Sequence, residues 1–283
     1  MITIFATIIT SLMPDTLRVQ TSKTKKIIIM KIIFITGAGM GIGRATAQYF
    51  YARGWTLGLA DLDSEALERF CDGKDTNRIS TYSLDVSDAK AVEKCIDEFC
   101  LNHDGQLDVL LNNAGILKVG SFEDLSIEDH QRTFAVNVNG TVNCLHAAFT
   151  YLKRTPNSTA INVSSASSNY GVPELSTYSA SKFAIKALTE ALELEWKEHG
   201  INVCDVVPPF VNTHMLSSQD VTSKALNKMG AQLVAGDVVR TIAKQVESPK
   251  LHRPVGFQYA ILHYLSDITP SFMQRWLMRY LSH

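Results

Sequence analysis

From residue 31 onward, short apolar runs alternate with longer stretches whose apolar residues recur at helical spacing. This alternation is typical of a parallel sheet that is wrapped by helices. Each run is nearly continuous in apolar residues, as expected for strands that are covered on both faces. We therefore predict an α/β fold: a doubly wound parallel sheet in three α/β/α layers, forming a single domain. The predicted strands are Ile32–Thr36, Thr56–Asp61, Ile79–Leu84, Leu107–Leu111, Thr159–Ser164 and Ile201–Val207.

The segment before residue 31 does not continue this pattern. Residues Ile2 to Met13 form an apolar run, but no cationic segment precedes it and it is too short to span a bilayer. Residues 14–26 are polar and basic, and Met30 stands directly before the first predicted strand. We expect residues 1–30 to be an N-terminal extension outside the fold. A membrane anchor is the alternative.

Composition narrows the classes of function. The chain has 27 Lys and Arg against 28 Asp and Glu and no basic run, which argues against nucleic-acid binding. Its five cysteines are scattered, with no Cys-x-x-Cys pair and no histidines at metal-ligand spacing. We expect no metal site, buried free thiols and a cytoplasmic protein.

A glycine-rich turn follows the first predicted strand and opens a predicted helix over Arg44–Arg53. From Thr36 to Gly43 it reads Thr-Gly-Ala-Gly-Met-Gly-Ile-Gly. Glycine permits a sharp turn and lets backbone amides approach a pyrophosphate, which then lies at the positive end of the helix. Packing of a tight strand–helix turn is the alternative reason for these glycines. Their placement inside a β-α-β unit favours a dinucleotide site.

The second predicted strand ends at Asp61, eighteen positions after Gly43. A carboxylate here accepts hydrogen bonds from the adenosine ribose hydroxyls and repels a 2′-phosphate. Neither position 38 nor position 62 carries Arg or Lys. These features favour NAD as the cofactor, with NADP as the alternative. Asp61 has a second possible role as the cap of the next helix, which Asp63 or Ser64 can serve as well.

Further motifs follow in order along the chain, and together with the glycine turn they span most of residues 31–213. They resemble the shorter, single-domain branch of the short-chain dehydrogenase/reductase family. The resemblance implies a Rossmann-type domain over residues 31–257. The motifs are Thr36-Gly37-x-x-x-Gly41-Ile42-Gly43, Asn112-Asn113-Ala114-Gly115, Asn137-Val138-Asn139-Gly140, Ser165 thirteen positions before Tyr178, and Tyr178-Ser179-Ala180-Ser181-Lys182.

The resemblance implies four catalytic residues: Asn137, Ser165, Tyr178 and Lys182. Tyr178 and Lys182 are four apart on a predicted helix, so their side chains share one face, roughly 6 Å apart at Cβ. A tyrosine pKa near ~10 is too high for a base at neutral pH. We expect the ammonium, with the positive nicotinamide ring, to favour the phenolate. Ser165 would orient the substrate oxygen and stabilise its developing charge.

By the same resemblance, Lys182 holds the nicotinamide ribose and Asn137 holds a water that links Lys182 to solvent. The implied enzyme transfers a hydride between NAD(H) and a secondary alcohol or ketone. Two alternatives stay open: an NADP-dependent carbonyl reductase, and a dinucleotide-binding module without catalysis. Taken singly, the Tyr–Lys pair is also compatible with a solvated helix face, and a buried asparagine with a structural role.

The predicted cofactor site gathers residues from several strand ends. Asp85 and Val86 resemble the family's adenine-contacting pair, although Asp85 is also placed to cap the next helix. Pro209 departs from the family, which usually has glycine there, and removes an amide donor from the turn. The full predicted set is Gly37, Met40, Gly41, Ile42, Gly43, Asp61, Asp85, Val86, Asn113, Ala114, Gly115, Tyr178, Lys182, Pro208, Val211 and Thr213.

Two C-terminal segments complete the predicted organisation. Residues 214–236 correspond to the family's substrate lid, and their apolar side chains favour a lipophilic substrate. Residues 258–283 form a helical tail in which Thr269 caps a helix that starts at Pro270. We expect its apolar face to pack on the core or on a neighbouring subunit, with a membrane surface as the alternative.

The helix that carries Tyr178 is apolar well beyond one stripe. Its apolar residues are Phe183, Ile185, Ala187, Leu188, Ala191, Leu192, Leu194 and Trp196. Such a helix is expected to be covered on more than one side. The family resemblance implies that subunits pair across this helix and the preceding one, as a homodimer or a homotetramer.

Overall fold

The computed structural model describes residues 31–209, 211 and 233–282. These residues form a seven-stranded sheet in the order β3-β2-β1-β4-β5-β6-β7, in which all neighbouring strands are parallel. The α/β class and the doubly wound sheet are therefore confirmed. The predicted extension 1–30, Thr213 and most of the predicted lid 214–236 lie outside the described residues. The strands are β1 (Ile32–Thr36), β2 (Thr56–Asp61), β3 (Ile79–Ser83), β4 (Val109–Asn112), β5 (Thr159–Val163), β6 (Asn202–Val207) and β7 (His252–Pro254).

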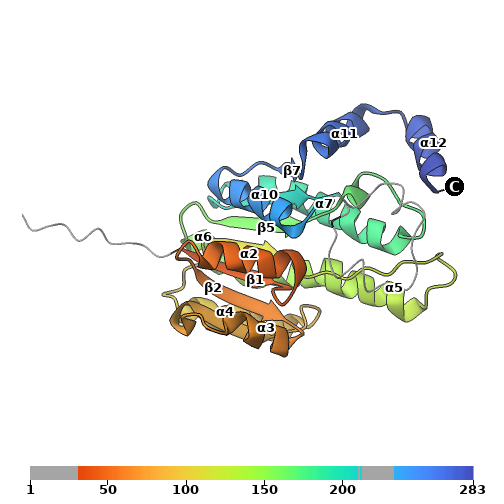
Figure 1. Cartoon of the computed structure of the whole chain (residues 1–283). Helices are drawn as coiled ribbons and strands as arrows, with labels where there is room; N and C mark the ends of the chain where they lie inside the picture. The colour runs from red at the N-terminus through yellow and green to blue at the C-terminus, as the bar shows by residue number, and fades with distance from the viewer. Residues whose placement is uncertain (1–30, 210, 212–232, 283) are drawn as a thin grey trace, which may run out of the picture.

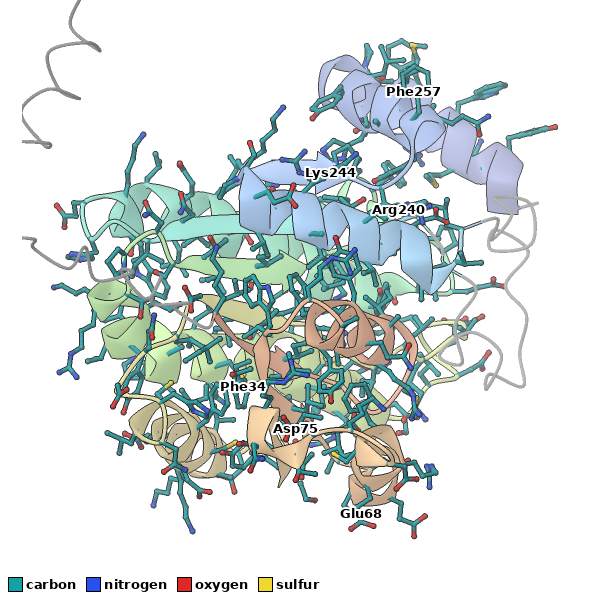
Figure 2. All side chains as sticks on the ribbon, turned by 60° about the vertical axis from the view of Figure 1, so that its left-hand side comes forward. Phe34, Glu68, Asp75, Arg240, Lys244 and Phe257 are labelled. Carbon is teal, nitrogen blue, oxygen red and sulfur yellow. The ribbon has the colours of Figure 1, made fainter. Side chains whose placement is uncertain are left out.

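Two helical layers cover the sheet (Figure 1). Along β1 the side chains alternate between them, because successive residues of a strand point to opposite faces. Ile33 and Ile35 pack in one core cluster, and Phe34, which Figure 2 labels, packs in the other. Helices α2 (Gly41–Tyr51), α3 (Ser64–Cys71) and α10 (Ala235–Glu247) cover the first face, and α4 (Ala89–Leu101), α6 (Gly140–Arg154) and α7 (Ser176–Lys197) cover the second.

The remaining described elements are short or lie at the C-terminus. A 3-10 turn at Thr76–Arg78 precedes β3, and another at Ala166–Ser168 follows β5. Helix α5 (Ile127–Phe134) continues through a π-helical turn, Ala135–Asn139, into α6. Helices α11 (Phe257–Ile268) and α12 (Ser271–Ser282) end the chain. Within the described residues, no helix has the length and apolarity that crossing a bilayer requires.

The strand order reverses between β1 and β4, which are neighbours at the centre of the sheet. In open α/β sheets, ligands bind beside such a reversal, outside the carboxyl ends of the strands. Asn112, the last residue of β4, donates from Nδ2 to Asn162 Oδ1 of β5 at 2.9 Å. This residue therefore braces the sheet. The fold therefore places a ligand site at the ends of β1 and β4.

The C-terminal tail differs from the prediction in two ways. Thr269 does not begin the last helix, because its hydroxyl donates to Leu265 O at 2.7 Å and ends α11; α12 begins at Ser271. Two large apolar side chains of α12 also do not pack on the core. Phe272 and Trp276 are 70% and 68% exposed in the chain alone, so the expected core packing is wrong for these two residues.

Candidate active site

A cleft opens at the carboxyl ends of β1, β4 and β5, where the strand order reverses. Most of the predicted site residues line it, although they come from segments far apart in the sequence. Two described exceptions are Gly43 and Asn137, which lie behind the cleft wall. The predicted residues that line it are Gly37, Met40, Gly41, Ile42, Asp61, Asp85, Val86, Asn113, Ala114, Gly115, Ser165, Tyr178, Lys182, Pro208 and Val211.

The glycine turn has no room for side chains at two of its positions. Gly37 has φ +64°, and a Cβ there would meet Asn113 Nδ2 and Ala114 Cα at 2.9 Å. At Gly43 a Cβ would lie 2.0 Å from Gly37 O. Asn113 locks the same turn by donating from Nδ2 to both Thr36 O and Gly37 O at 2.9 Å. Only glycine fits at these two positions of the closely packed turn, whose residues Gly37 and Gly41 line the cleft.

Helix α2 begins at this turn, three residues earlier than predicted, because Gly41, Ile42 and Gly43 are already helical. Among the described residues, no side chain caps its first turn, and that turn carries no acidic residue. The first amides of a helix need acceptors from outside it, and the partial positive charge there attracts anions. This helix end is chemically suited to the phosphates of a dinucleotide.

Asp61 lies at the end of β2 and faces the same turn. Its Oδ2 accepts from Gly39 N at 2.8 Å and its Oδ1 accepts from Asp63 N at 3.0 Å. The cap of α3 is instead Asp63, which accepts from Ala66 N at 2.9 Å. Asp61 is therefore a cleft-lining carboxylate and not a helix cap. A cation stands close by, because Arg44 Nη1 donates to Ala66 O at 3.4 Å.

Asp85 follows β3, the strand that pairs with β2, and has a partner that the sequence did not suggest. Arg132 of α5 donates to Asp85 Oδ2 at 2.8 Å, and Ser87 donates to Oδ1 through its amide and its hydroxyl. These hydrogen bonds and the guanidinium charge outweigh partial burial and lower the pKa of Asp85. Helix α4 is capped by Asp88, so capping is not the role of Asp85.

The three predicted catalytic side chains of the cleft come from two elements. Ser165 follows β5, and Tyr178 and Lys182 lie one turn apart in α7. The Ser165 hydroxyl lies close enough to the Tyr178 phenol to lower its pKa. Lys182 Nζ donates to Val163 O at 2.8 Å and lies 5.6 Å from the centroid of the Tyr178 ring. Fold and helical spacing thus bring the predicted hydroxyl, phenol and amine together.

Burial dominates the acid–base properties of this group. Desolvation raises the pKa of Tyr178 above its usual value, and the nearby Ser165 hydroxyl opposes that rise. Desolvation lowers the pKa of Lys182 to about 8. Burial thus penalises both charged forms. The predicted joint effect of the Lys182 ammonium and the positive nicotinamide ring on the phenol stays a prediction.

Asn137 lies in the π-helical turn, a feature often found at functional positions. Its side chain is buried and makes two hydrogen bonds to the backbone of one residue: Oδ1 accepts from Ile116 N at 2.7 Å, and Nδ2 donates to Ile116 O at 3.0 Å. Nδ2 also donates to Ser181 Oγ at 3.1 Å. The side chain thus ties the segment after Gly115 to α7, whereas the predicted water-holding role stays a prediction.

Several cleft residues were not predicted from the sequence. Most are apolar and lie beside predicted residues. Only their position near a strand end could have indicated them. Arg132 carried no local signal, because its partner Asp85 is 47 positions away. The additional lining residues are Leu62, Leu84, Ile116, Leu117, Arg132, Val136, Val163, Ser164 and Pro209.

Metal-ligating residues do not gather in the described part of the chain, where no three of His, Cys, Asp or Glu are placed to hold an ion. All five cysteines are free thiols. Cys95, Cys100, Cys144 and Cys204 are buried, and Cys71 is half-buried.

Comparison with known proteins gives consistent matches. The profile of the short chain dehydrogenase family matches residues 31–245. Meso-2,3-butanediol dehydrogenase of Serratia marcescens is 36% identical over 196 residues, covering 69% of this chain and 77% of the relative. The 3-ketodihydrosphingosine reductase of Bacteroides thetaiotaomicron is 31% identical over 193 residues, covering 68% of each chain. A short-chain dehydrogenase/reductase from Burkholderia phymatum, solved with NAD, superposes with a TM-score of 0.74 at 25% identity, covering 83% of this chain and 92% of that one.

Proposed function

This chain belongs to the short-chain dehydrogenase family and is an NAD(P)-dependent oxidoreductase of CH–OH groups, and we propose that it uses NAD on a secondary alcohol or ketone with Tyr178 as the proton carrier. One observation carries the proposal: Ser165, Tyr178 and Lys182 meet in the same cleft as the glycine turn. Within the described part of the chain, helix α2 begins at that turn without a side-chain cap or an acidic residue in its first turn, which fits the phosphates of a dinucleotide.

When bound, the nicotinamide accepts a hydride from the alcohol carbon, or donates one to the ketone in reverse. Tyr178 takes the hydroxyl proton during oxidation and returns it during reduction. The Ser165 hydroxyl lies close to the Tyr178 phenol, so a substrate oxygen that contacts both hydroxyls is fixed for transfer and its negative charge is stabilised. Lys182, when protonated, favours the phenolate from one turn away.

The raised pKa of Tyr178 bears on the direction of proton transfer. A neutral phenol is ready to donate its proton, as ketone reduction requires. Alcohol oxidation requires the phenolate, which neighbouring positive charge stabilises. We therefore infer that oxidation depends more steeply on pH than reduction does. Rates measured in both directions against pH test this inference, and parallel profiles would contradict it.

The preference for NAD rests on Asp61, whose carboxylate lines the cleft where a 2′-phosphate of NADP would have to lie. NADP stays the alternative because the Arg44 guanidinium, a positive charge, lies close to Gly39 and Ala66. Asp61→Ala should shift the kcat/KM ratio toward NADP by at least tenfold. The matched control is Asp63→Ala, which removes a helix cap and an exposed ion pair with Arg69 but no group that lines the cleft. If wild type already prefers NADP, the assignment fails.

The substrate is proposed to be lipophilic. Leu117, Pro209 and Val211 give the cleft an apolar border beside the catalytic hydroxyls. One relative is named as a reductase of 3-ketodihydrosphingosine, a long-chain ketone, although another is named for a short diol. The direct experiment is an absorbance assay with NAD(H) and NADP(H) over ketones and secondary alcohols graded by chain length. Rising kcat/KM with chain length supports the proposal. Cofactor binding without any turnover would instead identify a non-catalytic module.

We further propose that subunits pair across α6 and α7. Val142 of α6 and Phe183 and Leu194 of α7 are exposed in the single chain, Leu194 by 69%. Exposed apolar side chains on neighbouring helices are suited to a homodimer or homotetramer interface. Light scattering should report a multimer for wild type and a smaller species for Leu194→Glu. The free thiols and the near-zero net charge also support our proposals of a cytoplasmic location and of no nucleic-acid partner.

A further inference from the structure

We propose that α11 and α12 together, here called the C-terminal helix pair (257–282), dock on an anionic lipid surface. Figure 1 shows the pair set apart from the three-layer body, and in Figure 2 the helix labelled at Phe257 stands off from the sheet. Of the 20 large apolar side chains that are exposed in the described residues, nine lie on these two helices. Contiguous exposed apolar surface marks an interaction site.

The exposed residues of α12 have the composition of an interfacial helix. Phe272, Trp276 and Tyr280 follow one another at single-turn spacing, and the rings of Trp276 and Tyr280 stack with centroids 6.2 Å apart. Met273 extends the same exposed stripe. Tryptophan and tyrosine are enriched where a protein meets the boundary between water and lipid, because each has an apolar body and a polar tip.

Helix α11 carries exposed apolar side chains of its own. Phe257 is 82% exposed, and Ile261, Leu262, Tyr264 and Leu265 are exposed as well. Neither helix is long enough to cross a bilayer, so the pair can only lie on a lipid surface. That arrangement buries the apolar side chains among acyl chains without inserting the body of the protein.

Charge distinguishes a lipid surface from a second copy of the chain. Arg275 and Arg279 are exposed and lie one turn apart beside the apolar stripe, and α12 contains no acidic residue. Cations at the edge of an apolar face match an anionic headgroup layer. In a two-fold contact through this face, each α12 would present its cations to its own copy, which is unfavourable. The charge pattern therefore favours anionic lipid.

The helix pair is tied to the loop that carries the catalytic serine. Asn169, four residues after Ser165, donates from Nδ2 to Ser266 Oγ at 3.1 Å and pairs with His263 Nδ1 at 2.9 Å. Gln274 in turn donates to Ser266 O at 2.7 Å, joining α12 to α11. Docking the pair therefore fixes the orientation of the catalytic loop toward the lipid surface.

The helix pair also contacts the segment between Ser165 and Tyr178. Arg275, Met278 and Arg279 line a shallow pocket together with Tyr170 and Glu174, which belong to the segment between Ser165 and Tyr178. Docking would therefore hold the segment between the two catalytic hydroxyls near a membrane-dissolved alcohol or ketone. That consequence rests on the proposed function, whereas lipid docking itself does not.

The test is co-sedimentation of the full chain with phosphatidylcholine vesicles, pure or mixed equally with phosphatidylglycerol. We expect at least tenfold stronger binding to the mixed vesicles. The double variant Phe272→Glu/Trp276→Glu should lose at least tenfold, and Arg275→Gln/Arg279→Gln should bind both vesicles alike. The matched control is Leu101→Glu, because Leu101 is 67% exposed on α4 and should leave binding unchanged. None of these measurements depends on turnover, so a failure to bind vesicles is distinct from a failure of the proposed function.

A fluorescence measurement keeps the proposal testable if a glutamate variant does not fold. Trp276 is the exposed one of three tryptophans, since Trp196 is buried and Trp55 half-buried. Brominated lipid should quench the wild type, and Trp276→Phe should bind but lose the quenching. The proposal is overturned if wild type stays in the supernatant, if its fluorescence is not quenched, or if Phe272→Glu/Trp276→Glu lowers the oligomeric mass, which would show that a second copy covers the face.

Discussion

Substituting alanine for Gly43 tests whether the glycine turn excludes a side chain at this position. A Cβ at this position would lie 2.0 Å from Gly37 O, about 1.4 Å inside the shortest ordinary contact. Neither obstacle can move cheaply, because one is backbone and the other, Asn113 Nδ2 at 2.7 Å, is held by two carbonyls. The turn must open to accept the methyl group.

Overpacking of this kind costs roughly 1–3 kcal/mol, whereas alanine for glycine inside a helix ordinarily gains about 0.5–1 kcal/mol. The matched control is Gly236, in the first turn of α10, where a Cβ would meet nothing closer than Arg240 Nη1 at 3.8 Å. Gly236→Ala should therefore raise the free energy of unfolding and Gly43→Ala should lower it. Their melting temperatures should differ by roughly 5–10 °C.

The assay is urea unfolding of both variants, together with titration of NAD into each. Gly43→Ala should also bind NAD at least tenfold more weakly, since the widened turn no longer aligns its amides. If Gly43→Ala is as stable as Gly236→Ala, the close approach of Gly43 to Gly37 does not constrain the fold. If stability falls but NAD affinity holds, the turn is a packing feature and not a phosphate cradle.

Three further substitutions test other parts of the account. Lys182→Met should be more stable than wild type by roughly 2–3 kcal/mol at pH 7, because folding lowers the pKa of Lys182 from 10.5 to about 8. Between about pH 8 and pH 10.5 the unfolded chain binds the extra proton, so the stability of the wild type rises with pH and the difference between the two proteins closes. A difference in urea unfolding that does not change with pH would contradict this sign. Asn112→Ala leaves Asn162 Oδ1 without its buried donor and should cost about 1–3 kcal/mol in the same assay, with an unchanged midpoint as the contrary result. Arg132→Gln should raise the pKa of Asp85 but cost no more than about 1 kcal/mol, because both side chains are partly exposed; a larger loss would mean that the pair does more than screen a surface charge.

The central strands and the helix that holds Tyr178 could be predicted from the sequence alone. β1 and β2 have the predicted bounds because each is an unbroken apolar run between polar ends. β7 was not predicted, because His-Arg-Pro has no apolar pattern. It is a strand through tertiary contacts: it pairs with β6, and His252 Nδ1 bonds the buried Asp205 Oδ2 at 3.0 Å.

The candidate site shows the same division between local and distant information. The spacing of Tyr178 and Lys182 fixes their shared face, because helical geometry is local. The partner of Asp85 and the backbone contacts of Asn137 depend on how α5 packs, which no short motif encodes. The exposure of Trp276 could not be predicted either, because an amphipathic pattern gives the direction of an apolar face but not what covers it.

Tyr178→Phe tests the central claim most directly, because it removes one oxygen from the cleft and leaves the ring in place. NAD affinity and turnover should both be measured, with the best substrate of the chain-length panel. The account predicts nearly unchanged NAD affinity and a loss of turnover of at least about 10²-fold, the usual contribution of a positioned acid–base group. Turnover close to that of wild type would show that the proton is carried elsewhere.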